Sequence, residues 1–337
     1  MKISVLPLLA LLMCAVPAMA SVTISSPTKG SLVVSPFGLN AAATPCWSQP
    51  IVGMTYWLDN SSRRTTVGTG AVLSVQVSAS TGSHTVHVSA LTRFGSCASA
   101  SVSIKVVPSP LASVPTSAIV VKSIQAMPNW IEADDLASGN GTATGTMQLV
   151  SSPSLSGHAR SFVTEYTNSE GERYSVVFDQ DPAATHFLYD AWIWVADPSA
   201  DMANLEFDMN QVMSDGNTVI FGVQCDGYSG TWDVTANAGT PESFNDQWVH
   251  STAPCNPRTW TTNTWHHVQM TYSRNSDGNV TYQAVYLDGV ERELDTTLPS
   301  SFTLGWASVL LTNFQVDGLG GYGSVTAYID NLTVYRW

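Results

Sequence analysis

Acidic and amide side chains alternate with apolar ones in the segment 204–211, which reads NLEFDMNQ. In an extended strand successive side chains point to opposite faces, so the polar residues at its centre would lie together, away from the apolar ones. These are Glu206, Asp208 and Asn210. Neighbouring carboxyl groups suit proton transfer at a glycosidic bond, and they equally suit hydrogen bonding to the hydroxyl groups of a sugar. The segment therefore indicates a carbohydrate site that either cuts its ligand or only holds it.

Cleavage of a glycosidic bond needs two carboxyl groups on opposite sides of the bond, about 5–5.5 Å apart for retention or about 6.5–9.5 Å apart for inversion. Glu206 and Asp208 would lie on the same side, next to each other. On the catalytic hypothesis another strand supplies the missing acid. The candidates for that acid are Asp190, Asp226 and Asp233.

The predicted strands around this segment show the same alternation of apolar and polar residues. Indole rings stack on the apolar face of a pyranose, while carboxylates and amides bind its hydroxyl groups. We therefore predict that the side chains facing away from the apolar set form one ligand-binding surface. Its members are Asp190, Trp192, Trp194, Glu206, Asp208, Asn210, Gln224, His267 and Gln269. The alternative is that Trp192 and Trp194 are core residues and the polar residues form an ordinary solvated face.

The segment 224–265 is unusually rich in tryptophan. Loops rich in aromatic residues usually contact something. We predict that this segment forms a rim over the ligand-binding surface, with Trp232 and Trp248 in contact with the ligand. The alternative is that each tryptophan packs a loop that otherwise has no core.

The chain opens with a single lysine, an apolar run and the small residues Ala18 and Ala20. This order is typical of a secretory signal peptide, which we place at residues 1–20. The run is too short to span a membrane comfortably, and no second one follows. We expect a secreted, extracytoplasmic protein with no membrane span.

Acidic residues outnumber basic ones, with 26 Asp+Glu against 13 Lys+Arg. Loss of Lys2 with the signal peptide would change the formal charge from −13 to about −14. A charge of this sign disfavours nucleic acid and anionic membrane surfaces as partners. It suits a neutral or cationic ligand.

Four cysteines follow the predicted signal peptide, and a long cysteine-free stretch separates them into two pairs. An even number in an exported protein predicts disulfides. The economical pairing joins neighbours in the sequence, and the alternative is four free buried thiols. The predicted bonds are Cys46–Cys97 and Cys225–Cys255.

Proline is concentrated between residues 106 and 121, and at this density it stiffens an extended linker. We predict a linker at residues 108–117 between two all-β domains, at 21–107 and 118–337. The first holds six or seven short alternating runs, which predict a β-sandwich. The second holds longer runs separated by Asp-Gly turns, with no convincing amphipathic helix, which predicts a two-sheet jelly roll.

The order of runs in residues 21–107, with MTYWLD third and the closing stretch HTVHVSALTRFGSCASASVSIKVV, resembles bacterial immunoglobulin-like domains. The resemblance implies that Trp57 is the core tryptophan of the third strand. The cysteines depart from the antibody pattern, because a bond between them would tie two loops at one end of the sandwich.

The stretch TNTWHHVQMTYSRNSDGNVTYQAVYLDGVE and the closing GSVTAYIDNLTVYRW resemble laminin-G-like members of the concanavalin A-like lectin/glucanase superfamily. The resemblance is good over residues 186–337 and weaker over 118–185. It implies two curved sheets, with ligand usually on the concave one. The superfamily holds both lectins and glycosidases, so fold alone does not decide function.

Retaining β-glucanases of this superfamily carry E-x-D-x-E or E-x-D-x-x-E on one concave strand. Glu206 and Asp208 match the first two acids, and the resemblance implies that in an enzyme Glu206 would be the nucleophile or base and Asp208 its modulator. The third position holds Asn210, or Gln211 if the strand is bulged. Since an amide cannot deliver a proton to a leaving oxygen, this departure favours binding over catalysis. Asp330, near the C-terminus, resembles the structural calcium position of some jelly rolls, so a structural calcium ion is a further hypothesis; no other cofactor is expected.

The sequence therefore predicts a secreted, lectin-like protein that binds a poly- or oligosaccharide on the concave face of its jelly roll. The first alternative is a glycoside hydrolase or polysaccharide lyase that uses Glu206 and Asp208. The second alternative is an adhesion protein without a glycan ligand.

Overall fold

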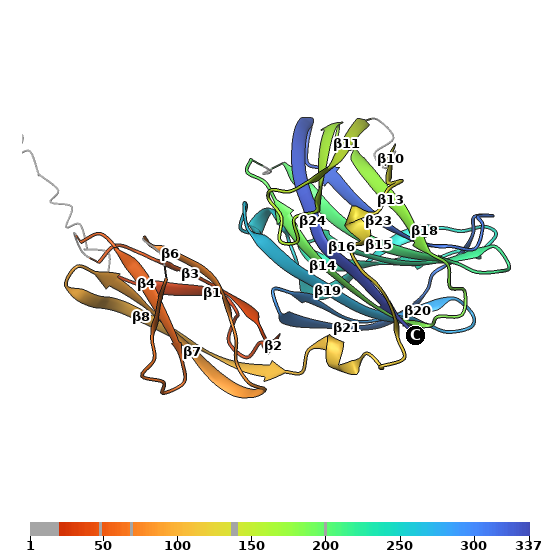
Figure 1. The fold of residues 1–337 in the computed structure, drawn as a ribbon. Helices are drawn as coiled ribbons and strands as arrows, with labels where there is room; N and C mark the ends of the chain where they lie inside the picture. The colour runs from red at the N-terminus through yellow and green to blue at the C-terminus, as the bar shows by residue number, and fades with distance from the viewer. Residues whose placement is uncertain (1–19, 47–48, 68–69, 136–140, 199–200) are drawn as a thin grey trace, which may run out of the picture. The chain divides into compact units, whose positions relative to one another are not determined.

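The computed structural model describes residues 20–46, 49–67, 70–135, 141–198 and 201–337. Strands dominate these residues (Figure 1), which confirms the all-β fold class. The helical elements of the described part are three 3-10 turns, at Pro110–Ser113, Ile124–Ala126 and Pro257–Thr259. In that part of the chain no helix is both long and apolar enough to traverse a lipid bilayer. The predicted signal peptide lies outside the described residues, apart from Ala20.

The contacts within the chain divide it into two compact units, residues 1–31 with 38–106, and residues 32–37 with 107–337. The described part of the first unit contains two antiparallel sheets. One has the order β1 (Val22–Ser26), β3 (Phe37–Ala43), β6 (Val72–Val77). The other has the order β8 (Gly95–Val107), β7 (Gly82–Thr92), β4 (Gly53–Leu58), β5 (Thr65–Val67). The domain limits given above remain a prediction.

Trp57 is not the core residue of the first unit. Its indole is partly exposed and stacks on the ring of His87, with 5.0 Å between ring centroids. The guanidinium of Arg64 covers it at 4.3 Å. Met54, on the opposite face of β4, is fully buried instead. The alternation along β4 therefore places Met54 inward and the tryptophan outward.

The second unit is a sandwich of two antiparallel sheets, which we call the groove sheet and the back sheet (Figure 1). The groove sheet has the order β10 (Ile131–Asp134), β13 (Gly171–Asp179), β23 (Leu310–Gly318), β15 (Met202–Val212), β16 (Asn217–Asp226), β17 (Thr231–Asn237), β18 (Asp246–Pro254), with β22 (Ser301–Thr303) beside β16. The back sheet has the order β11 (Thr142–Val150), β12 (Ala159–Thr167), β24 (Tyr322–Arg336), β14 (His186–Val195), β19 (Trp265–Arg274), β20 (Asn279–Leu287), β21 (Val290–Pro299), with β9 (Ile119–Val121) beside β24. Residues 32–37, with β2 (Leu32–Val34), also belong to this unit.

The apolar faces of the two sheets form one core. Phe207 of the groove sheet is fully buried and lies 6.4 Å, between ring centroids, from Tyr189 of the back sheet. Phe187 and Phe221 meet across the same interface at 5.0 Å. Since burying one such side chain contributes about 1.5–3 kcal/mol, these contacts fix which face of each strand turns inward. The polar residues between them are thereby turned outward.

Both predicted disulfides are confirmed. Cys46 and Cys97 join in the first unit with a Cα–Cα distance of 6.1 Å, and Cys225 and Cys255 join in the second with 5.2 Å. The second bond ties β16 to the end of β18, two strands away in the groove sheet. It therefore fastens the edge of that sheet to its centre.

Candidate functional site

Polar side chains cover the outer face of the groove sheet in rows set by the strand register. Glu206 of β15 lies between Gln315 of β23 and Gln224 of β16. In the next row Asp208 lies between Asn313 and Gly222. The sequence alternation therefore does bring the two acids of the quoted segment to one face, beside amides from both neighbouring strands.

These rows form the floor of a groove with a volume of about 1140 Å³. Its lining includes Asp135, which directly follows edge strand β10, and Asp246, at the start of edge strand β18. Because residues from both edges of the sheet line the same groove, the sheet must curve around it. Glu206, Asp208 and Asn210 lie on the central strand of this curved surface.

Aromatic rings border the polar floor. Phe244 and Trp306 line the groove and are 50% and 46% exposed, so neither ring is taken up by the core. Trp248 of β18 also lines it and is partly buried. An exposed ring beside hydrogen-bonding groups suits a ligand with one apolar face and a polar edge.

Several buried oxygen atoms of the floor have no hydrogen-bond partner. They are Oδ1 of Asp208, Oδ1 of Asn210 and Oγ1 of Thr235, which line the groove, and Oε1 of Gln224 beside them. Buried polar groups are normally paired, because an unpaired one costs about 1–3 kcal/mol. Gly222 keeps two of these atoms open, since a β carbon there would overlap Thr235 Oγ1 and lie 2.9 Å from Asp208 Oδ1. The floor is therefore built with hydrogen-bonding capacity that the protein itself does not use.

Burial raises the pKa values of the carboxyl groups of the floor. Burial, together with the neighbouring charges of Asp317 and Asp208, raises the pKa of Glu206 well above its usual range. One amide nitrogen, Gln315 Nε2, donates to Glu206 Oε1 at 2.9 Å and to Asp317 Oδ1 at 3.0 Å. Burial also raises the pKa of Asp317 to about 6. Glu206 and Asp317 thus form a close pair, in which the charge of Asp317 opposes ionisation of Glu206.

Asp208 titrates in the same range. Burial, with the charge of Asp246 next in importance, raises the pKa of Asp208 to about 7. Burial likewise raises the pKa of Asp246 and of Asp135. Perturbed carboxyl groups gathered in one cleft are characteristic of functional sites.

A second polar cluster lies beside the groove floor on β16, β17 and β18. Asp226, Asp233 and His250 bring their ligand atoms within 4.8 Å of one another, a set that could hold a metal ion. His250 Nδ1 lies 2.8 Å from Asp233 Oδ2, and Thr231 Oγ1 donates to Asp233 Oδ1 at 2.6 Å. Gln224 separates Asp233 from Glu206 in the strand register. Asp226 and Asp233 are therefore near Glu206 but outside the lining of the groove.

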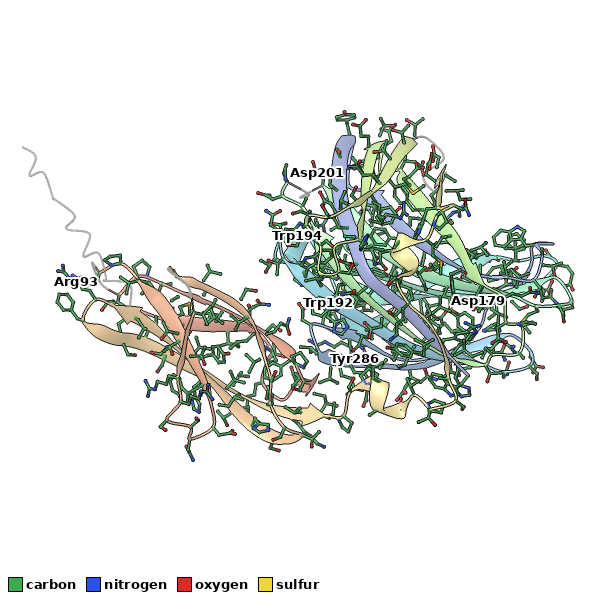
Figure 2. The ribbon with its side chains drawn as sticks, viewed as in Figure 1. Arg93, Asp179, Trp192, Trp194, Asp201 and Tyr286 are labelled. Carbon is green, nitrogen blue, oxygen red and sulfur yellow. A yellow bond between two sulfur atoms is a disulfide. The ribbon has the colours of Figure 1, made fainter. Side chains whose placement is uncertain are left out.

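The prediction that nine residues share one surface is wrong. Five of them lie on the outer face of the back sheet, on the far side of the core from Glu206: Asp190, Trp192, Trp194, His267 and Gln269. Trp192 and Trp194 project from β14 (Figure 2). Alternation with a period of two tells which side chains avoid the core, but not which of two sheets carries them. Asp190 is thereby excluded as a catalytic partner of Glu206.

These back-sheet residues bind one another. His267 stacks on Trp192 with 4.5 Å between ring centroids. The two carboxylate oxygens of Asp190 contact His267 Nε2 at 2.7 Å and Gln269 Nε2 at 2.8 Å. Trp194 packs edge-on against Trp265 at 5.6 Å. This network uses much of the polar capacity that a ligand would need.

The two tryptophans of segment 224–265 differ in position. Trp232 is 1% exposed and lies 6.4 Å from Phe207 in the core, so the expected ligand contact of Trp232 is wrong. The segment is strand β17 at this point, and its alternation turns Trp232 inward while Thr235 faces the groove. Trp248 does lie in the groove, as a rim residue would.

Asp330 is surrounded by hydrogen-bond donors. Its Oδ2 accepts from Ser154 Oγ and from the backbone N–H groups of Leu155 and Ser156, at 2.6–2.9 Å. Its Oδ1 accepts from Gln125 Nε2, Ser156 Oγ and its neighbour's N–H, at 2.6–3.1 Å. Burial opposes ionisation, but the serine donors outweigh it, and the pKa of Asp330 lies below its usual value. Six donors occupy both oxygens, which is the arrangement of a loop anchor rather than of a calcium ligand.

Several groove residues escaped the sequence analysis. Asn313 and Gln315 alternate with the apolar core residues Phe314 and Val316 of β23, and the period-two rule applied to that strand would have found both. Arg173 lies on β13 and Asp135 follows edge strand β10, and no local sequence pattern connects either strand to β15. Phe244 and Trp306 lie outside the strands, where periodicity carries no information.

No family model matches the chain, and no curated protein matches it. Solved structures are similar at low identity. A carbohydrate-binding module of the β-sandwich superfamily is 12% identical, with 94% of this chain and 98% of that chain covered and a TM-score of 0.29. The cellulose-induced protein Cip1 is 12% identical, with 60% and 96% covered and a TM-score of 0.35. The carbohydrate recognition domain of Emp47p is 9% identical, with 68% and 99% covered and a TM-score of 0.30.

Proposed function

We propose that the groove of the second unit binds a carbohydrate. The observation that carries this proposal is the set of unpaired oxygen atoms on the groove floor, beside exposed aromatic rings. Sugar hydroxyl groups would donate to Asp208, Asn210 and Thr235, and a pyranose face would stack on Trp248 or Trp306. Both halves of the amphipathic surface of a sugar are thus matched within one groove.

We propose that the second unit is a concanavalin A-like, laminin-G-like sandwich, with its ligand on the concave sheet. We propose that the first unit is an immunoglobulin-like spacer or adhesion module. The predicted signal peptide and the two disulfides support export, since such bonds persist in oxidising compartments.

A second candidate function is cleavage of the bound glycan by hydrolysis or elimination. It is favoured by the close pair of Glu206 and Asp317, which Gln315 bridges, and by Asp208, whose pKa of about 7 allows it to donate or accept a proton at neutral pH. Release of reducing ends or of unsaturated products, lost in Glu206→Gln, would establish this activity. Glycan retention without product release would leave binding as the function.

Replacing Trp248 by alanine is expected to weaken glycan binding by about tenfold or more, because a stacking ring is lost from the groove. Trp192→Ala, on the back sheet, is the matched control and is expected to leave binding unchanged. Affinity would be measured by titration calorimetry with oligosaccharides that a glycan panel shows to be retained by the wild-type protein. Loss of binding in Trp192→Ala but not in Trp248→Ala would place the binding site on the back sheet and would refute the proposal that the groove binds the glycan.

A further inference from the structure

Acidic residues outnumber basic ones in the described lining of the groove. Its lining includes the acids Asp135, Glu206, Asp208 and Asp246, and a single basic residue, Arg173. Arg173 Nη1 already lies 3.6 Å from Asp135 Oδ1, so its charge is partly offset. Asp317 adds a fifth carboxyl group, hydrogen-bonded through Gln315 to the floor. An anionic glycan would have to place its carboxylates or sulfates against this excess of acids.

The unpaired atoms of the floor are mostly hydrogen-bond acceptors. Asp208 Oδ1 and Asn210 Oδ1 are hydrogen-bond acceptors, and Gln224 Oε1 beside them is a third. Asn210 is 2% exposed and lines the groove, so its side chain is held in place by the surrounding structure while its oxygen has no hydrogen-bond partner. Thr235 Oγ1 can donate or accept, so acceptors outnumber donors among the unpaired atoms, and this favours a ligand that donates. An ammonium group brings three N–H donors, no acceptor and a positive charge.

From these two observations we propose that the groove takes a cationic glycan, one whose residues carry free amino groups. The inference rests on the proposed carbohydrate function and adds the class of sugar. An ammonium group beside Asp208 would meet the unpaired acceptor, and its positive charge would favour the ionised form of that carboxyl group. N-acetylation would remove the positive charge and two of the three donors.

The test compares β-1,4-linked hexamers of glucosamine, N-acetylglucosamine, glucose and glucuronic acid, which share a backbone and differ in charge. Affinities would be measured by titration calorimetry with EDTA present throughout, so that no bridging cation can create a preference. We expect the glucosamine hexamer to bind about tenfold or more tightly than the others, and its binding to weaken as salt is added.

Three variants assign the preference to residues. Asp208→Asn and Asp246→Asn each remove one groove charge and are expected to reduce the preference for glucosamine. Glu165→Gln removes one charge at an exposed position of β12 in the back sheet and should leave the preference intact. Equal loss in all three would show that only net charge matters and would overturn the assignment to the groove.

The remaining outcomes separate this inference from the proposed function. If a neutral or anionic hexamer binds as well as glucosamine, and Trp248→Ala abolishes that binding, the inference is overturned while the carbohydrate groove stands. If neither these hexamers nor any glycan of a broad panel binds, the proposed function fails, and the inference fails with it.

Discussion

Replacing Asp330 by alanine is expected to lower the free energy of unfolding of the second unit by about 3–5 kcal/mol. The carboxylate is fully buried, and the six donors around it come from η2 (Ile124–Ala126), from the loop before β12 and from β24 itself. Alanine would leave buried N–H and O–H groups without an acceptor, which costs far more than the loss of one ordinary hydrogen bond. In a unit of this size the change corresponds to a fall in Tm of roughly 6–20 °C.

The matched control is Glu165→Ala, which removes an exposed carboxylate from neighbouring strand β12. We expect its effect to stay within about 0.5 kcal/mol. Because the pKa of Asp330 is lowered in the folded state, its stabilisation is present above the unfolded pKa and is lost as pH falls through the folded value. Calorimetric unfolding of both variants at neutral pH measures the difference. An Asp330→Ala protein as stable as Glu165→Ala would show that the six hydrogen bonds do not form in solution.

The second large effect concerns the groove acids. The pKa of Asp208 is raised to about 7 and that of Asp317 to about 6, against usual values of 3.8. The folded protein therefore binds more protons than the unfolded chain between about pH 4 and 7. The stability contributed by this proton uptake is fully present below pH 4 and is lost as pH rises through the folded pKa values. The ligand-free protein should thus lose stability between pH 5 and 8.

Asp208→Asn is expected to remove part of this pH dependence and to stabilise the protein at pH 8 by about 2–4 kcal/mol. Asparagine keeps the shape of the side chain but needs no charge in the buried floor. Thermal unfolding at pH 5 and pH 8 would measure it, with Glu165→Gln as a control for the change in net charge. If the stabilities of Asp208→Asn and Glu165→Gln change identically with pH, the raised pKa of Asp208 in the buried floor is contradicted.

Local sequence patterns predicted which side chains face away from the core, but not which of these side chains lie on the same sheet. In β15 the alternation correctly turned Glu206 outward and Phe207 inward. In β14 it correctly turned Trp192 away from the core, yet this strand belongs to the other sheet. Which strands share a sheet depends on pairings between distant segments, such as β15 with β23, and these leave no trace in a window of a few residues.

Predicting the groove required knowledge of such distant pairings, whereas predicting the fold class did not. The disulfides followed from the number and grouping of cysteines, and the all-β class followed from alternation and turn residues. The aromatic border did not, because Trp306 and Phe244 lie in loops whose positions depend on β22 and β18. Trp232 was mistaken for a rim residue because its segment forms a strand rather than a loop.

The most direct test of the carbohydrate groove is a crystal structure of the full chain soaked with the oligosaccharide that it retains most strongly. The account predicts sugar rings over β15 and β23, with hydroxyl or amino groups on Asp208 and Asn210 and a ring face against Trp248 or Trp306. Sugar bound instead to Trp192 and His267 on the back sheet, with the groove empty, would contradict it.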